Sequence, residues 1–178
     1  MDAIEKGFDA LVTKVQEYEK KKEQLKGAVV QKEALLLARM GEETAPVISG
    51  IGLVMLERGK TDNCGELYDT QFYKEKMIVL GKTDPAEYRP DDISKKVTDQ
   101  FCVLSEEGKF YELMYSSDGF IVDSFRNPID PREALEIYGY EIMFMLYRAM
   151  RDYLAEEKEL VEALQKTIDF LHPEEMEK

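Results

Sequence analysis

The fold is decided first by a stretch near the N-terminus, which reads IEKGFDALVTKVQEYEKKKEQLKGAV from Ile4 to Val29. Apolar side chains recur in this stretch at alternating spacings of four and three residues, the rhythm of a coiled-coil helix. The positions on this seam are Ile4, Phe8, Leu11, Val15, Tyr18, Lys22, Leu25 and Val29. The pattern predicts one long helix over residues 2–40, which Gly41 would end and Pro46 could not continue.

A second stretch of the same kind reads YEIMFMLYRAMRDYLAEEKELVEALQKTIDFL from Tyr140 to Leu171. The helix that contains it is expected to begin earlier, where Asp130 can accept the first free amide hydrogens, Pro131 fits the first helical position and Glu133 completes a capping box. Its seam consists of Tyr140, Met143, Tyr147, Met150, Leu154, Glu157, Val161, Leu164, Ile168 and Leu171. The sequence therefore predicts a second continuous helix from residue 130 to about residue 171.

The two seams match when the helices are laid antiparallel and paired residue numbers sum to 179. Phe8 then lies opposite Leu171, and Lys22, the polar interruption of one seam, lies opposite Glu157, the interruption of the other. Heptad repeats align at every seven-residue shift, so the Lys22–Glu157 layer and the flush ends are the informative matches. A polar layer of this kind fixes the register of a coiled coil. We expect an antiparallel stalk in which Lys22 and Glu157 form that layer.

The middle of the chain has the short apolar runs and turn residues of an antiparallel sheet. The expected strands are 47–56, 67–73, 76–80, 101–104, 110–115 and 120–125, with a short helix starting at Asp91 or Asp92 and reaching about Val97. The last three strands follow one another through glycine-containing turns, as in a meander. We expect a sheet of five or six strands, with the long helices covering one face.

The expected fold class is α+β. Residues 1–43 and 130–172 would form the stalk, residues 44–129 the β-rich head and residues 173–178 an acidic tail, all in one folding unit. A long helix, a sheet and a returning helix resemble in outline the prefoldin class of chaperone subunits, which have smaller β-hairpins between their helices. This resemblance implies an architecture and no particular activity.

The charge balance narrows the expected partners. The 178 residues include 24 Lys+Arg and 37 Asp+Glu, for a net charge of −13. Nucleic acids and anionic membrane surfaces are attracted by positive charge, so neither is expected as a partner. A basic protein is the partner that such a chain would attract, and a homodimer is a further possibility. Without a signal-peptide pattern or a long apolar run, the expected location is the cytoplasm, where Cys64 and Cys102 would stay free thiols.

Few residues suggest catalysis or metal binding. The only histidine, His172, precedes a proline, which argues against histidine general bases, catalytic triads and two-histidine zinc sites. Cys64 lies in a polar turn without an obvious activating base. Three carboxylates, Asp62, Glu66 and Asp69, could gather a hard cation but lack the EF-hand spacing. The Gly-Lys-Thr triplets at 59–61 and 81–83 lack the other glycine of a phosphate-binding loop and are expected to be turns. No cofactor is expected.

One stretch could bind a small ligand. Met and Tyr side chains are concentrated in residues 138–153, and Tyr138, Met145 and Tyr147 could line a pocket for a flat apolar molecule between the sheet and the C-terminal helix. The same residue types also suit ordinary core packing and adaptable protein surfaces.

Three functional hypotheses follow. The first is a non-enzymatic protein-binding module, such as an assembly factor, adaptor or chaperone-like subunit. The second is a sensor or carrier that holds a small ligand in the Met/Tyr-lined pocket. The third, which the residues favour least, is an enzyme that uses carboxylates or Cys64.

Overall fold

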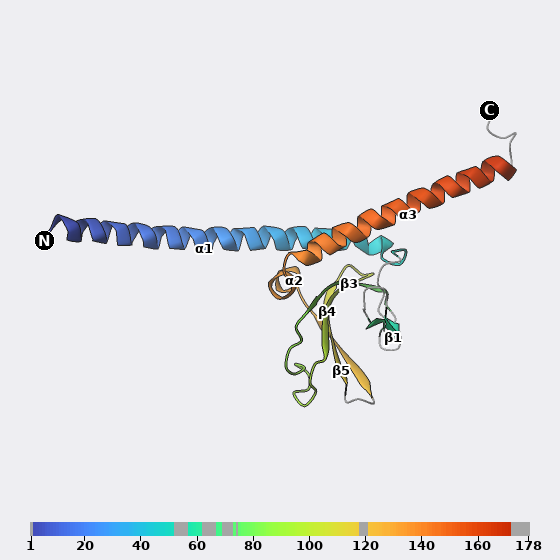
Figure 1. Ribbon diagram of the computed structural model, residues 1–178, viewed down its shortest axis with the longest axis horizontal. Coiled ribbons are helices and arrows are strands. Elements are labelled where there is room, and N and C mark those ends of the chain that lie inside the picture. Colours follow the sequence, from blue (N-terminus) through green and yellow to red (C-terminus); the bar gives the residue numbers. More distant parts are fainter. Residues whose placement is uncertain are drawn as a thin grey trace.

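The computed structural model describes residues 2–51, 57–61, 67–68, 73, 75–117 and 121–171; for 57–61 and 67–68 it describes the backbone only. Long helices lie on one side of a sheet (Figure 1). The elements are α1 (Ala3–Thr44), a 3-10 turn η1 (Ala45–Val47), β1 (Glu57–Thr61), β2 (Leu67–Tyr68), β3 (Met77–Thr83), β4 (Asp99–Ser105), β5 (Phe110–Ser117), β6 (Val122–Pro128), α2 (Pro131–Tyr138) and α3 (Glu141–Leu171). The α+β class is confirmed.

The long N-terminal helix is confirmed, but the prediction that Gly41 ends it is wrong. α1 continues to Thr44, and Pro46 lies in the 3-10 turn that follows. Gly41 is buried, and a Cβ atom placed there would lie 2.8 Å from Cε2 of Phe110. The glycine therefore allows β5 to approach the helix closely. In the sequence alone, a glycine needed for such packing looks the same as a glycine that ends a helix.

Substituting Gly41 should separate packing from helix propensity. Gly41→Ala is expected to destabilise the fold by about 1–3 kcal/mol, because the new methyl group overlaps the buried Phe110 ring. Gly27→Ala is the matched control in the same helix, since no atom lies within 4 Å of the added Cβ, and it should stabilise by up to about 1 kcal/mol. Urea unfolding at one protein concentration measures both. Equal effects would mean that Phe110 does not restrict Gly41.

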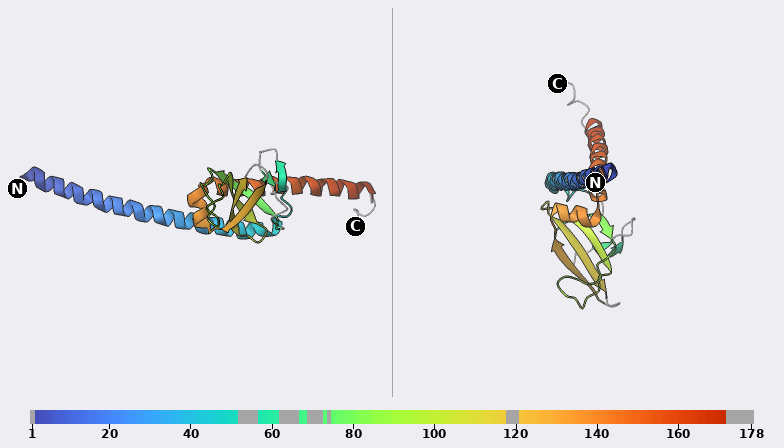
Figure 2. Two further views of the ribbon diagram at one scale, coloured as in Figure 1. Left: turned by 90° about the horizontal axis from the view of Figure 1, so that it is seen from below. Right: turned by 90° about the vertical axis from the view of Figure 1, so that its left-hand side faces the viewer.

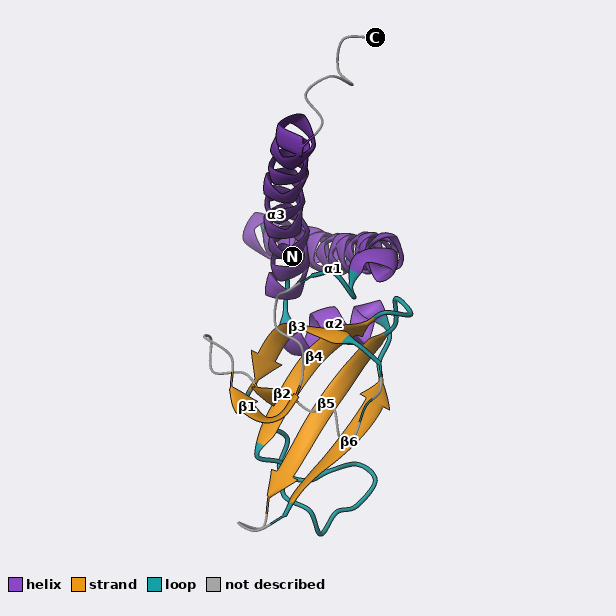
Figure 3. Cartoon of the chain, turned by 90° about the vertical axis from the view of Figure 1, so that its right-hand side faces the viewer, coloured by secondary structure: helices purple, strands orange, loops and turns teal. Residues whose placement is uncertain are grey.

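The head contains a four-stranded antiparallel sheet in the order β3-β4-β5-β6 (Figure 3). The predicted meander of the last three strands is confirmed, and the turn between β4 and β5 uses Gly108 at φ +76°. The prediction of one sheet with five or six strands is wrong. β1 and β2 pair with each other as a separate two-stranded sheet. β3 is an edge strand of the larger sheet, and its pairing with β4 shifts register between Val79 and Gly81. An irregularity of this kind bends and twists the strand.

The short helix expected from Asp91 or Asp92 to Val97 is also wrong. Asp92 does accept the backbone N–H of Ser94, at 3.0 Å, but the chain turns there and does not start a helix. Tyr88 and Lys96 then form an isolated bridge that closes the loop. Asp side chains accept backbone hydrogen bonds in turns as readily as at helix starts. The sequence therefore correctly indicated a capping Asp, but no helix follows it.

The C-terminal helix is two helices. The predicted start is confirmed, because Asp130 accepts the N–H groups of Arg132 and Glu133 and the Glu133 side chain accepts the N–H of Asp130. The predicted continuity is wrong, because Gly139 adopts φ +75° and ends α2 after eight residues. α3 then begins at Glu141 in a new direction and ends at Leu171, close to the predicted end.

Two apolar clusters form the core. The first joins the helices to one face of the sheet, and its buried members include Leu37 of α1, Ile142 and Leu146 of α3, and Leu104 and Phe110 of the sheet. The second lies on the opposite face of the sheet and includes Phe101 and Tyr115, whose rings meet edge to face. Alternate residues of β4 and β5 enter the two clusters, as the pleat of a strand requires.

The predicted stalk is not formed within the chain. α1 and α3 cross the head in roughly the same direction, so the N-terminal half of α1 leaves on one side and the C-terminal half of α3 on the other (Figures 1 and 2). The break at Gly139 and the burial of Ile142, Met143 and Leu146 hold the first turns of α3 on the head. The antiparallel pairing, and with it the prefoldin-like outline, is therefore wrong for a single chain.

Candidate functional site

The first candidate surface is the α1 arm, which we define as residues 3–29. Every residue of this arm is exposed. The apolar residues of its seam, Ile4, Phe8, Leu11, Val15, Tyr18, Leu25 and Val29, are between 52% and 77% exposed. An open apolar hollow on the arm is lined by Tyr18, Lys21, Lys22, Leu25, Lys26, Val29 and Val30. A contiguous apolar stripe of this length on an exposed helix marks an interaction surface.

The second candidate surface is the α3 arm, residues 154–171. All of these residues are exposed as well. The apolar residues of its seam, Leu154, Val161, Leu164, Ile168 and Leu171, are between 49% and 62% exposed. The two arms project from opposite sides of the head, and neither is covered by another described part of the chain (Figure 2).

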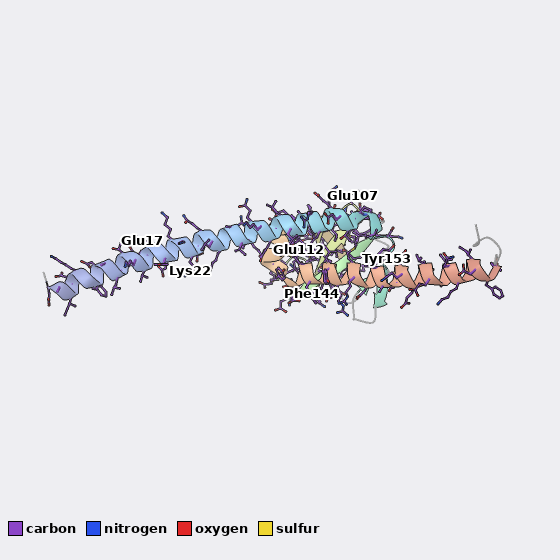
Figure 4. All side chains as sticks on the ribbon, turned by 90° about the horizontal axis from the view of Figure 1, so that it is seen from above. Glu17, Lys22, Glu107, Glu112, Phe144 and Tyr153 are labelled. Carbon is purple, nitrogen blue, oxygen red and sulfur yellow. The ribbon has the colours of Figure 1, made fainter. Side chains whose placement is uncertain are left out.

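The head-proximal part of α3 is apolar on nearly all sides but is buried on only one. Ile142, Met143, Leu146 and Ala149 pack into the core. Phe144 and Tyr147 on the remaining surface of α3, and Tyr140 just before the helix, are 53–60% exposed, and Phe144 points away from α1 (Figure 4). A helix that is apolar all round is normally covered on more than one side. The exposed apolar surface therefore continues from the α3 arm onto the head.

The predicted polar layer is not assembled within this chain. Lys22 projects from the α1 arm, on the side of that helix opposite to Glu17 (Figure 4). Glu157 lies on the α3 arm, which leaves the head in the other direction. Both side chains belong to fully exposed helical segments, so each is available to a partner.

The residues of the predicted ligand pocket lie in different surroundings. Tyr138, in α2, is partly buried, and its hydroxyl donates a hydrogen bond to Oε1 of Glu112 at 3.1 Å. Burial raises the pKa of this phenol above its usual range, and the negative charge of the nearby Glu112 is the second largest cause of the same shift. Met145 is partly buried in α3, and Tyr147 of the same helix is exposed. Tyr138 thus faces the sheet, while Tyr147 contributes to the exposed surface of α3.

Glu112 is the centre of a buried polar network in the head. Its side chain is only 4% exposed and accepts hydrogen bonds from Nε2 of Gln100, from Tyr138 and, at 3.4 Å, from Nδ2 of Asn127. The amide of Gln100 is oriented by the backbone N–H of Ala86, which donates to its Oε1 at 2.7 Å. The network connects α2, three strands and the loop after β3, so it fixes α2 on the sheet.

A second network pins the loop between β3 and β4 to β6. The buried Arg89 guanidinium donates to Oδ1 of Asp91 at 2.9 Å and to Oδ2 of Asp123 at 2.8 Å, and Lys95 also contacts Asp123. Hydrogen bonds from Arg89 hold the pKa of Asp91 below its usual range, and those from Lys95 and then Arg89 do the same for Asp123. Charge-assisted pairs of this kind stay ionised and keep the loop in place.

Several residues singled out in the sequence lie outside the described residues, namely Asp62, Cys64, Glu66, Asp69 and His172. Cys102 is buried in β4, as its apolar strand predicts, and burial raises the pKa of its thiol. Within the described ranges, no group of three or more His, Cys, Asp or Glu side chains is placed to hold a metal ion. Of the helices in that same part of the chain, none combines the length and apolarity needed to cross a bilayer.

Sequence reasoning missed both networks. Glu112 is the one charged residue within the otherwise apolar run 110–115 of β5, and this charge inside an apolar strand was the available signal. Arg89 gave no signal, because its partner Asp123 is distant in the sequence.

The chain matches none of the protein-family models, curated proteins or solved structures with which it was compared.

Proposed function

We propose that this protein is a non-enzymatic protein-binding module that acts through its two helical arms, as an assembly factor, adaptor or chaperone-like subunit. The observation that carries the proposal is the pair of apolar seams, each running along a helix that the head leaves uncovered. Amphipathic helices of this kind hold other helices in a groove or a coiled coil.

Charge supports a particular class of partner segment. Residues 154–171 carry four glutamates and one aspartate but only two lysines. A partner helix with lysines beside its apolar seam would be steered to the α3 arm and oriented on it. The α1 arm is close to neutral as a whole, with six lysines and five acidic residues, but residues 14–26 carry five of those lysines and only three glutamates, so this part favours an acidic helix.

Native mass spectrometry of protein purified gently from its own source tests the proposal. We expect a defined complex that contains at least one further polypeptide, because the seams are too apolar to stay exposed in the working protein. That polypeptide can be another protein or a second copy of this chain.

Two results would contradict the proposal. One is a lone chain of 20.6 kDa at micromolar concentration. The other is a single chain with a stoichiometric small-molecule mass, which would instead favour the ligand carrier and direct attention to Tyr138, Met145 and Tyr147.

A further inference from the structure

We infer that the partner of each arm is a second copy of this chain, with the α1 arm of one copy paired antiparallel with the α3 arm of the other. This inference deepens the proposed function and rests on it. The resulting dimer has two equivalent stalks, and Lys22 of each copy meets Glu157 of its partner.

The first reason is that the two arms complement each other but cannot meet within one chain. They leave the head on opposite sides (Figure 1). Pairing by the sum of 179 places apolar residues together in five layers, Phe8 with Leu171, Leu11 with Ile168, Val15 with Leu164, Tyr18 with Val161, and Leu25 with Leu154. All ten of these side chains are exposed.

The polar layer selects this register among the possible ones. A shift of seven residues in one direction would place Lys22 against Leu164 and Glu157 against Val29. A shift in the other direction would place Lys22 against Met150 and Glu157 against Val15. Each shift buries the charges of Lys22 and Glu157 against apolar side chains. The register in which residue numbers sum to 179 instead pairs these two charges with each other.

The second reason is symmetry. Because α1 and α3 run in roughly the same direction across the head, a two-fold axis perpendicular to them reverses both helices in the second copy (Figure 2). Each α1 arm then has an antiparallel α3 arm on its own side of the dimer. Such an arrangement is closed, so the paired segments of both copies are covered and no further copy is recruited.

The third reason is the distribution of charge. The matched segments, residues 8–25 and 154–171, each contain eighteen residues, or about 27 Å of helix. The α1 segment is lysine-rich around Lys22, and the α3 segment is acidic around Glu157. Pairing α3 with α3 would instead bring two acidic segments together, while the α1 segment, with four lysines and four acidic residues, has no net charge to repel α3.

Disulfide trapping between two copies tests the inference. Lys22→Cys is made in one copy and Glu157→Cys in the other, with Cys64→Ser in both; Cys102 is buried and stays in place. After the two variants are mixed, unfolded and refolded together, a covalent dimer of both is expected on oxidation. Gln24→Cys replaces Lys22→Cys as the control, because it lies on the opposite side of the same helix. At least about tenfold less dimer is expected for it, since disulfides need close Cβ atoms.

Each other outcome overturns the inference. Covalent dimers of Lys22→Cys alone would show that α1 pairs with α1. A disulfide within one chain that carries both cysteines would show an intramolecular stalk. No disulfide at all, from a protein that native mass spectrometry finds bound to a different polypeptide, would remove the second copy as the partner and leave the proposed function standing.

Charge exchange supplies a second readout that does not depend on cysteines. Lys22→Glu is expected to weaken dimerisation about tenfold or more, because it places two carboxylates together in each stalk. Adding Glu157→Lys to the same chain should restore the affinity. Failure of the second substitution to restore it would mean that these two residues are not paired between copies.

Discussion

Val15→Asp is expected to weaken dimerisation at least about a hundredfold. Burying a Val side chain contributes about 1.5 kcal/mol or more, and the substitution removes that burial in both stalks of a two-fold dimer. The new carboxylate would also face Leu164 of the partner. A loss of about 3 kcal/mol or more corresponds to a factor of a hundred or more in the dissociation constant. Sedimentation velocity over a series of protein concentrations measures it.

Thr13→Asp is the matched control for this prediction. Thr13 and Val15 have side chains of almost the same shape, lie two residues apart in α1 and are both exposed in the single chain. Both substitutions add one negative charge to the same arm. Thr13 faces away from the seam, so its variant should dimerise as the wild type does. Equal behaviour of the two variants would show that the seam is not an interface.

Glu112→Ala is expected to destabilise the head by about 3 kcal/mol or more. The substitution removes a buried acceptor and leaves donors on Gln100, Tyr138 and Asn127 without it, and a buried donor left unpaired costs about 1–3 kcal/mol. Glu112→Gln keeps one acceptor oxygen and should cost less, about 1 kcal/mol. Equilibrium unfolding in urea at a fixed protein concentration measures the difference.

A double-mutant cycle shows whether the cost comes from the network. Tyr138→Phe removes the phenol that donates to Glu112, and combining it with Glu112→Ala should cost less than the sum of the two single effects, by about 1 kcal/mol. Additive effects would mean that the Tyr138 hydrogen bond does not contribute. Glu107→Ala, an exposed carboxylate in the β4–β5 turn, should leave the unfolding midpoint unchanged.

The local signals in the sequence were strong where one short segment determines the structure. The Asp130–Glu133 capping box came from side chains that act on their own backbone. The meander of β4, β5 and β6 came from alternation and from glycine at the turn. Each of these features depends on residues within a few positions of one another, so the sequence displays it directly.

Errors arose where two elements that are distant in the sequence meet. Gly41 and Gly139 are both helical-region glycines, yet Gly41 lies within its helix beneath the Phe110 ring and Gly139 breaks its helix at φ +75°. The sequence shows only a glycine at each position and does not distinguish a glycine that allows close packing from one that allows a turn. Likewise, nothing local to residues 57–68 distinguishes pairing with each other from pairing with the edge of β3.

The sequence by itself determined that two long helices each carry an apolar seam interrupted by one charged residue, Lys22 in one and Glu157 in the other, because heptad spacing is a property of each helix alone. Only the tertiary structure decided that those seams are not joined within the chain. α1 and α3 cross the head in roughly the same direction (Figure 1), held on it by the burial of Leu37, Ile142 and Leu146 in one core, and the break at Gly139 separates α3 from α2. A heptad pattern shows that a helix can pair along its seam, and the packing of the head shows that the two seams do not pair within one chain.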